Sequence, residues 1–211
     1  MTSTIDLKRL ESRAFMAYHQ DGLWDMFIGT ILIINFIPGI LSDAGFSSFA
    51  SLGIFFGMMA ATYGGFRTLR RKITIPRLGM AQFGPHRKIR KRKSMAIMAV
   101  SVSLTALVFF LSIAFWNGLL TDFGKILHNP LLLGLFFAMK MLVVFSFVSY
   151  FLDFIRGYFI GAIMAASVFL LIYTKDSTYM MGGGVILFII GTIYLIRFLK
   201  KNSLPEKIME D

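Results

Sequence analysis

The sequence has no cysteine and few acidic residues. Without cysteine there are no disulfide bonds, no thiolate nucleophiles and no thiolate metal ligands. Only 16% of the 211 residues are charged, well below the roughly 25% of a soluble domain, and 11 acids stand against 22 basic residues. Hydrophobic residues make up 56% of the chain. This composition predicts a membrane protein.

The residues that usually build catalytic or metal sites are also scarce. The three histidines, His19, His86 and His128, all fall in the connections between apolar runs, and no two of them are spaced as His-x-x-x-His. No Gly-x-Ser-x-Gly motif is present. We therefore expect no catalytic residues, no metal site and no cofactor, and a protein that is not an enzyme.

Six apolar runs are long enough to cross a bilayer, which takes about 20 residues in a helix. They lack the strict alternation of barrel strands, so the sequence predicts an all-α bundle of six transmembrane helices. The expected spans are Leu23 to Leu41, Phe46 to Phe66, Met95 to Trp116, Pro130 to Leu152, Gly157 to Thr174 and Met180 to Leu199. Pro38, with Asn35 one turn before it, predicts a kink in the first span.

Charge in the connections predicts the orientation. Residues 67–93 contain eleven Lys and Arg and no acid, and short basic loops stay in the cytoplasm. If the chain has six spans, nineteen of the 22 basic residues and both termini lie on the cytoplasmic side. The expected segments are a cytoplasmic amphipathic segment (1–22), helices one and two (23–66), a basic loop (67–94), helices three to six (95–199) and a cytoplasmic tail (200–211). The expected location is the cell membrane.

Two segments outside the spans have patterns of their own. Residues 4–20 place apolar side chains at helical spacing, which favours an amphipathic helix on the membrane surface or packed on the loop. The first 22 residues do not resemble a cleaved signal peptide, so we expect an uncleaved first span. Residues 73–76 alternate like a strand and residues 80–83 can return, which predicts a small hairpin.

Polar residues inside the spans are candidate pathway residues. Lys140 lies near the bilayer midplane, where an ammonium costs roughly 2.5 to 3.5 kcal/mol and needs a partner. Its role could be an interhelical contact, a site on an anion or lipid pathway, or a side chain that reaches a thinner region. Asn35 is a polar alternative in span one, and Asp25 either caps that helix beside Trp24 or binds an arginine of the basic loop. Asp153 could bind an arginine of that loop too.

Small residues recur every four positions in two spans. Such stripes let helices approach closely, either within one chain or between subunits. They are Gly53, Gly57, Ala61 and Gly65 in span two, and Gly157, Gly161 and Ala165 in span five. Gly182, Gly183 and Gly184 predict a flexible or closely packed entrance to span six.

The residues Arg70-Arg71-Lys72-Ile73-Thr74-Ile75-Pro76-Arg77-Leu78-Gly79, together with Asp21-Gly22-Leu23-Trp24-Asp25, resemble patterns in small multi-helix membrane proteins of prokaryotes. The resemblance covers a small part of the chain and carries no activity, cofactor or ligand. It implies that the acidic entrance to span one and the core of the basic loop belong together.

The sequence favours a non-enzymatic membrane protein that acts through its basic cytoplasmic face. We expect this face to bind anionic lipid or a partner protein, in a homo-oligomer or a membrane complex. The alternative is a channel or transporter for an anionic or amphipathic solute, with Lys140 on the pathway. Nucleic acid is not expected, because Phe83 is the loop's only aromatic residue. The candidate binding residues are Arg70, Arg71, Lys72, Arg77, Arg87, Lys88, Arg90, Lys91, Arg92 and Lys93.

Overall fold

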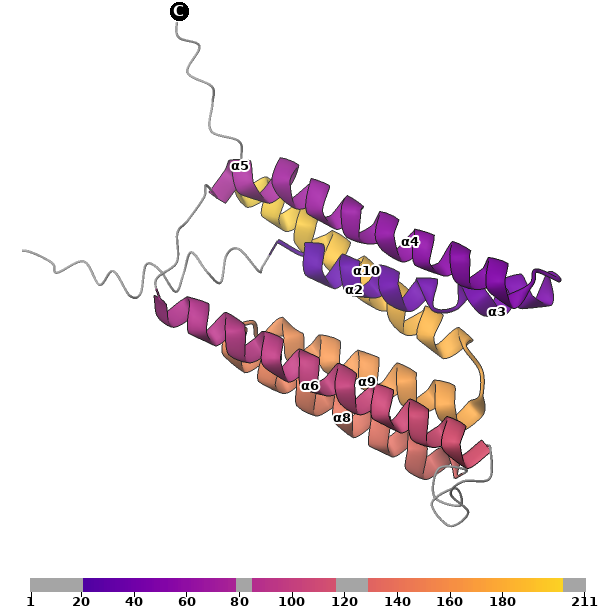
Figure 1. Cartoon of the computed structure of the whole chain (residues 1–211). Coiled ribbons are helices and arrows are strands. Elements are labelled where there is room, and N and C mark those ends of the chain that lie inside the picture. Colours follow the sequence, from indigo (N-terminus) through magenta and orange to yellow (C-terminus); the bar gives the residue numbers. More distant parts are fainter. Residues whose placement is uncertain (1–20, 79–84, 117–128, 203–211) are drawn as a thin grey trace, which may run out of the picture. The chain divides into compact units, whose positions relative to one another are not determined.

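The computed structural model describes residues 21–78, 85–116 and 129–202, and all elements in these ranges are helices. The all-helical fold predicted from the sequence is therefore confirmed for this part of the chain, which Figure 1 shows. The helices are α2 (Leu23–Ile34), α3 (Ile37–Asp43), α4 (Ser48–Leu69), the π-helix η1 (Arg70–Thr74), α5 (Ile75–Leu78), α6 (Pro85–Trp116), α8 (Pro130–Leu152), α9 (Arg156–Thr174) and α10 (Thr178–Lys201). The amphipathic segment 4–20 lies outside the described residues.

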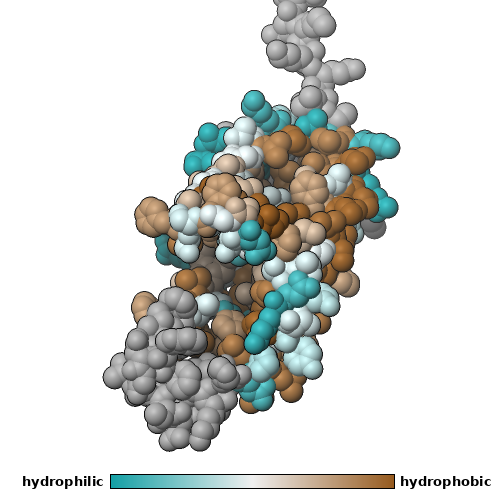
Figure 2. Space-filling view, turned by 90° about the vertical axis from the view of Figure 1, so that its right-hand side faces the viewer, coloured by the Kyte–Doolittle hydropathy of each residue, from teal (hydrophilic) through white to brown (hydrophobic). Residues whose placement is uncertain are grey.

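Among the described residues, five helical stretches are long and apolar enough to cross a membrane. They are Leu23–Asp43, Ser48–Arg77, Pro130–Leu152, Arg156–Thr174 and Thr178–Lys201. The expected third span lies inside α6 and stays a prediction. Large apolar side chains cover much of the helix surface, including Phe49 and Phe159, which are 88% and 71% exposed. Figure 2 shows such side chains in brown, as expected for helices that face lipid.

The first candidate span is broken, as Pro38 predicted. α2 ends at Ile34 and α3 begins at Ile37. Pro38 sits in the first turn of α3, where a missing N–H costs no helical hydrogen bond. At the break, the side-chain amide of Asn35 donates a 2.7 Å hydrogen bond to the carbonyl of Ile31, so the polar group is satisfied within its own helix.

The chain divides into two compact units. Unit 1 comprises residues 1–84 and 184–211, and unit 2 comprises residues 85–183. Unit 1 thus contains α2 to α5 together with most of α10, which returns from the far end of the sequence. Unit 2 contains α6, α8 and α9.

The core of unit 1 is the close contact between α2 and α10. A Cβ placed on Gly29 would lie 2.7 Å from the carbonyl oxygen of Gly184, and one on Gly191 would lie 2.6 Å from the backbone nitrogen of Met26. The two backbones therefore approach closely enough that only glycine fits at these positions. Leu32 and Leu187 are almost completely buried beside this contact.

The glycine run before span six is placed differently from the expectation. α10 begins at Thr178, so Gly182 to Gly184 lie inside the helix rather than at its entrance. Gly184 packs against α2, which bears out close packing as the reason for this glycine.

The hairpin predicted within residues 73–83 is wrong in its described part. Residues 73–78 are helical, and α4, η1 and α5 form one continuous helical stretch from Ser48 to Leu78. Extending an existing helix pairs most backbone groups within the segment, whereas an isolated two-stranded hairpin is marginal. Residues 80–83 lie outside the described part. Residues 67–78, expected as part of the loop, are therefore helical, and residues 85–94 form the basic start of α6.

Unit 2 is held by the packing of α9 on α8. A Cβ on Gly161 would lie 2.5 Å from the Cβ of Phe145, and Gly157 packs equally tightly against Ser149. Ala165, the third member of this stripe, is 3% exposed. The stripe in span five is therefore an intramolecular contact. This packing brings the last turn of α8 beside the first turn of α9.

Candidate functional site

A buried carboxylate joins the start of α2 to the end of the η1 π-helix. The Thr74 hydroxyl donates a 2.7 Å hydrogen bond to one carboxylate oxygen of Asp21, and the backbone N–H of Leu23 donates a 3.0 Å bond to the other. Asp21 and Thr74 are both completely buried. This hydrogen bond joins the acidic entrance to span one to the basic segment through Asp21 and Thr74, rather than through Asp25 or the Pro76–Gly79 core.

The π-helix sets the direction of the Thr74 side chain. Pro76 comes two residues after Thr74, in the first turn of α5, and has no N–H to donate, which interrupts the regular helical hydrogen-bond pattern. A π-turn shifts the following side chains around the helix axis. Arg77 then donates to the carbonyl of Ile73 at 3.0 Å, which holds the end of the stretch.

An aromatic cluster lies next to this contact. The rings of Trp24 and Phe66 are 5.0 Å apart, and Phe27 lies 4.7 Å from Phe66. The guanidinium of Arg70 lies 5.7 Å from both the Trp24 and the Phe66 ring, a cation–π geometry. Trp24 therefore packs between α2 and α4. Asp25, one residue on, is 1% exposed in the first turn of α2.

The same end of unit 1 carries a group of exposed basic residues, which we call the basic end of unit 1. It forms because α2 contacts α4 and α10 where both of those helices end. Positive charge there also complements the helix dipoles. Its members are Arg67, Arg71, Lys72, Arg197, Lys200 and Lys201. The other end of unit 1 has no Lys or Arg among its described residues 35–57.

Unit 2 has its own charged end. Both carboxylate oxygens of Asp153 accept hydrogen bonds from Arg90 Nη1, at 3.1 and 3.0 Å, and the two side chains are 31% and 47% exposed. The expectation that Asp153 binds an arginine of the basic segment is therefore confirmed. Asp153 has a positive φ of 50° where α8 ends. The guanidinium of Arg156 lies 5.3 Å from the Phe154 ring.

For the other candidate residues of the basic segment, the structure describes some side chains and only the backbone of the rest. Arg92 and Lys93 are exposed on the first turns of α6, near Arg90 in sequence. The backbone of Arg87, Lys88 and Lys91 is helical, and their side chains lie outside the described part of the structure.

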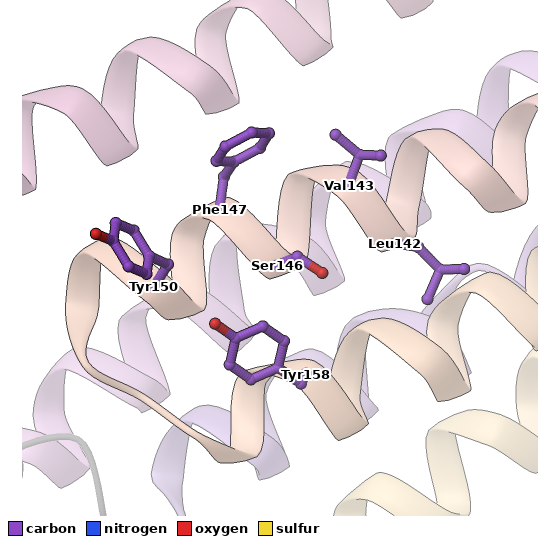
Figure 3. Close-up of a pocket in the computed structure, with 6 residues that line it drawn as sticks. All are labelled: Leu142, Val143, Ser146, Phe147, Tyr150 and Tyr158. Carbon is purple, nitrogen blue, oxygen red and sulfur yellow. The ribbon is translucent and has the colours of Figure 1, made fainter.

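An open pocket of about 450 Å³ is lined by α8 and α9 next to the charged end of unit 2. Figure 3 shows its lining: Leu142, Val143, Ser146, Phe147 and Tyr150 come from α8, and Tyr158 comes from α9. Tyrosines are common at the level of lipid headgroups, because the ring is apolar and the hydroxyl is polar.

Lys140 is half-buried in the middle of α8. Its ammonium donates a hydrogen bond to the Thr105 hydroxyl of α6 and lies 5.1 Å from the Phe137 ring. An interhelical contact, one of the three roles expected for Lys140, is thus present. Asn35 and Asp25, the other candidate pathway residues, belong to unit 1.

The two glycine stripes have different surroundings. Gly157, Gly161 and Ala165 are buried against α8, whereas Gly53, Gly57, Ala61 and Gly65 are all exposed on α4. Apart from Gly184, the glycines of the α2–α10 contact were not predicted from the sequence. Their signal is a spacing of seven, two helical turns, in both helices: Gly22 and Gly29, and Gly184 and Gly191.

Comparison of this chain with family models, with curated proteins and with solved structures finds no match.

Proposed function

We propose that this is a non-enzymatic multi-pass membrane protein whose basic helix ends bind anionic lipid headgroups at one membrane surface. The supporting observation is the separation of charge within unit 1. Six exposed basic residues gather where α4 and α10 end, while residues 35–57 at the other end contain no Lys or Arg.

Asp21 and Asp25 are buried, and Asp21 accepts its described hydrogen bonds from Thr74 and Leu23. Each Lys or Arg near an anionic bilayer contributes about 1 kcal/mol of attraction. Six such residues on one unit give a binding surface that is strong at low salt and weaker at high salt.

The proposed topology follows from the same charges. The basic ends lie in the cytoplasm, with six spans and both termini on that side of the cell membrane. The span that is added to the five candidate spans is the third along the chain, Met95 to Trp116 in α6. An acidic partner protein, or another subunit in an oligomer, would suit the same surface, and the following experiment separates lipid from protein.

The test uses the full chain in phosphatidylcholine vesicles that contain spin-labelled phosphatidylglycerol or spin-labelled phosphatidylcholine. The fraction of label immobilised by the protein is measured at low and high salt. We expect a preference for phosphatidylglycerol that falls by about twofold or more in Lys200→Gln/Lys201→Gln. Lys175→Gln, on an exposed lysine outside the basic end, is the control. Equal immobilisation of both lipids at low salt would reject lipid binding and leave a protein partner.

We propose a second function, transport of an amphipathic anion with Lys140 on the pathway. The observation that favours it is an ammonium beside an apolar groove in the middle of a candidate span. Uptake of a labelled anion into proteoliposomes should drop in Lys140→Met. No uptake by the unaltered protein would count against transport and would leave the lipid-binding proposal untouched.

A further inference from the structure

The ammonium of Lys140 has more hydrogen-bond donors than described acceptors, which is unusual inside a candidate span. An ammonium has three N–H donors. Among the described residues, Thr105 Oγ1 is the hydrogen-bond acceptor for Lys140, and the Phe137 ring lies 5.1 Å away. The Thr105 hydroxyl donates to the carbonyl of Ser101 at 2.8 Å, so its oxygen is left to accept from Lys140. At least one donor of the ammonium therefore remains for another acceptor.

Among the described residues of unit 2, the acids Asp153 and Asp176 lie just beyond the ends of α8 and α9, and none lies beside Lys140. The described acids all stand beside helix ends: Asp21, Asp25, Asp43, Asp153 and Asp176. The remaining acids fall in polar parts of the sequence, in residues 1–20, 117–128 and 203–211. An intramembrane lysine without an acid beside it is costly, which makes an external anion the natural counter-charge.

Lys140 is one of the residues that line an apolar groove between α6 and α8. The groove has a volume of about 570 Å³, within the roughly 300–1,000 Å³ of small-molecule sites. Val100 and Leu104 line it from α6, and Phe136, Val143 and Phe147 line it from α8. Lys140 is the one charged residue among the lining residues. A ligand that fits this lining is mostly alkyl and carries one negative charge.

The apolar surface continues toward the charged end of unit 2. Val143 and Phe147 line both this groove and the pocket that contains Tyr150 and Tyr158 (Figure 3). From Lys140 to Tyr150 the helix rises about 15 Å, at 1.5 Å per residue. An extended alkyl chain can follow this path.

We infer that the groove between α6 and α8 binds a single-chain anionic amphiphile, with its anionic head on Lys140 and its alkyl chain along Val143 and Phe147. This inference deepens the transport proposal by naming the class of ligand, and it requires binding alone. The shared chemistry is one anionic group on one alkyl chain, which a fatty-acid carboxylate or an alkyl phosphate can supply.

The test is photolabelling of the full chain in phosphatidylcholine proteoliposomes with a diazirine analogue of palmitate. Labelled peptides are mapped by mass spectrometry. We expect labelling on α6 and α8, with competition by palmitate or hexadecyl phosphate and at least tenfold weaker competition by hexadecanol, which lacks the charge. Whichever anion competes better identifies the headgroup. Absence of label from α6 and α8, or equal competition by hexadecanol, would overturn the inference.

Two variants examine the two parts of the site separately. Lys140→Met should lose labelling about tenfold or more, while Lys140→Arg should retain it. Val100→Trp keeps Lys140 but fills the groove at a position that is 68% exposed, so the fold should tolerate it and labelling should fall. Lys175→Met is the control for loss of a lysine elsewhere.

Unchanged labelling in both Lys140→Met and Val100→Trp would also overturn the inference. Uptake assays on the same proteoliposomes distinguish the two claims: labelling without uptake retains the site and removes transport. Uptake without labelling of α6 and α8 removes the site and retains transport by another route.

Discussion

The hydroxyl of Thr74 donates a 2.7 Å hydrogen bond to the carboxylate of Asp21, and neither residue is exposed. These residues are 53 positions apart in the sequence, so the bond ties the end of one candidate span to the entrance of another. A buried carboxylate loses its water, and hydrogen-bond donors must replace it.

Removing the Thr74 hydroxyl should destabilise the protein. Thr74→Val conserves the shape but leaves a buried carboxylate oxygen without this donor, at a cost of about 1–3 kcal/mol in the free energy of unfolding. Denaturant unfolding in mixed micelles measures it. Thr74→Ser keeps the hydroxyl and should cost clearly less. Equal losses in both variants would show that the threonine methyl group, not the hydrogen bond, matters.

The close approach of α2 and α10 gives a second prediction. A methyl group on Gly29 would meet backbone atoms of α10 at 2.7 Å, so Gly29→Ala must push the helices apart. We expect a loss of about 1–3 kcal/mol in the free energy of unfolding, typical of overpacking. Gly57→Ala on the exposed face of α4 is the matched control and should be neutral or slightly stabilising. Equal stability of the two variants would contradict close packing at Gly29.

The Arg90–Asp153 pair should contribute little to stability. Its side chains are 47% and 31% exposed, and exposed ion pairs contribute about 0.2–1 kcal/mol. A double-mutant cycle with Arg90→Gln and Asp153→Asn should give a coupling energy in that range that declines with salt. Asparagine suits this position because it tolerates a positive φ. A coupling energy well above about 1 kcal/mol would mean that the pair is shielded from solvent.

Asp176 predicts a specific pH dependence. The backbone N–H of Thr178 donates a 2.9 Å hydrogen bond to its carboxylate, and this bond lowers the pKa of Asp176 below its ordinary value. A lowered pKa in the folded state means that the contribution to stability is present above the unfolded-state pKa and is lost as pH falls through the folded one. Carboxyl carbon-13 NMR of Asp176 measures the titration directly. A short peptide that contains aspartate is the reference, and an Asp176 midpoint at or above that of the peptide would contradict the prediction.

Local features explain which sequence predictions succeeded. The broken first span follows from Pro38, because a missing N–H acts within one helical turn. The helices themselves follow from long apolar runs, since a backbone surrounded by lipid must pair its own polar groups. The contact of Asp153 with an arginine followed from charge, although the sequence did not identify Arg90.

The misses come from contacts between distant segments. The alternation at residues 73–76 resembled a strand, but it does not reveal that Thr74 would be buried against Asp21 in a continuous helix. The small-residue stripes predicted from the sequence have a spacing of four. The glycines that hold α2 against α10 have a spacing of seven and lie at opposite ends of the sequence.

The sequence by itself determined the helical class, the candidate spans and the basic character of particular helix ends. Each of these depends on composition within a stretch of about 20 residues. Only the tertiary structure decided that α10 joins α2 and α4 in unit 1, that Asp21 is paired with Thr74, and that Lys140 meets Thr105 beside an apolar groove. These depend on which helix faces pack together, and that is set by close backbone approach and by buried polar groups finding partners far away in the chain.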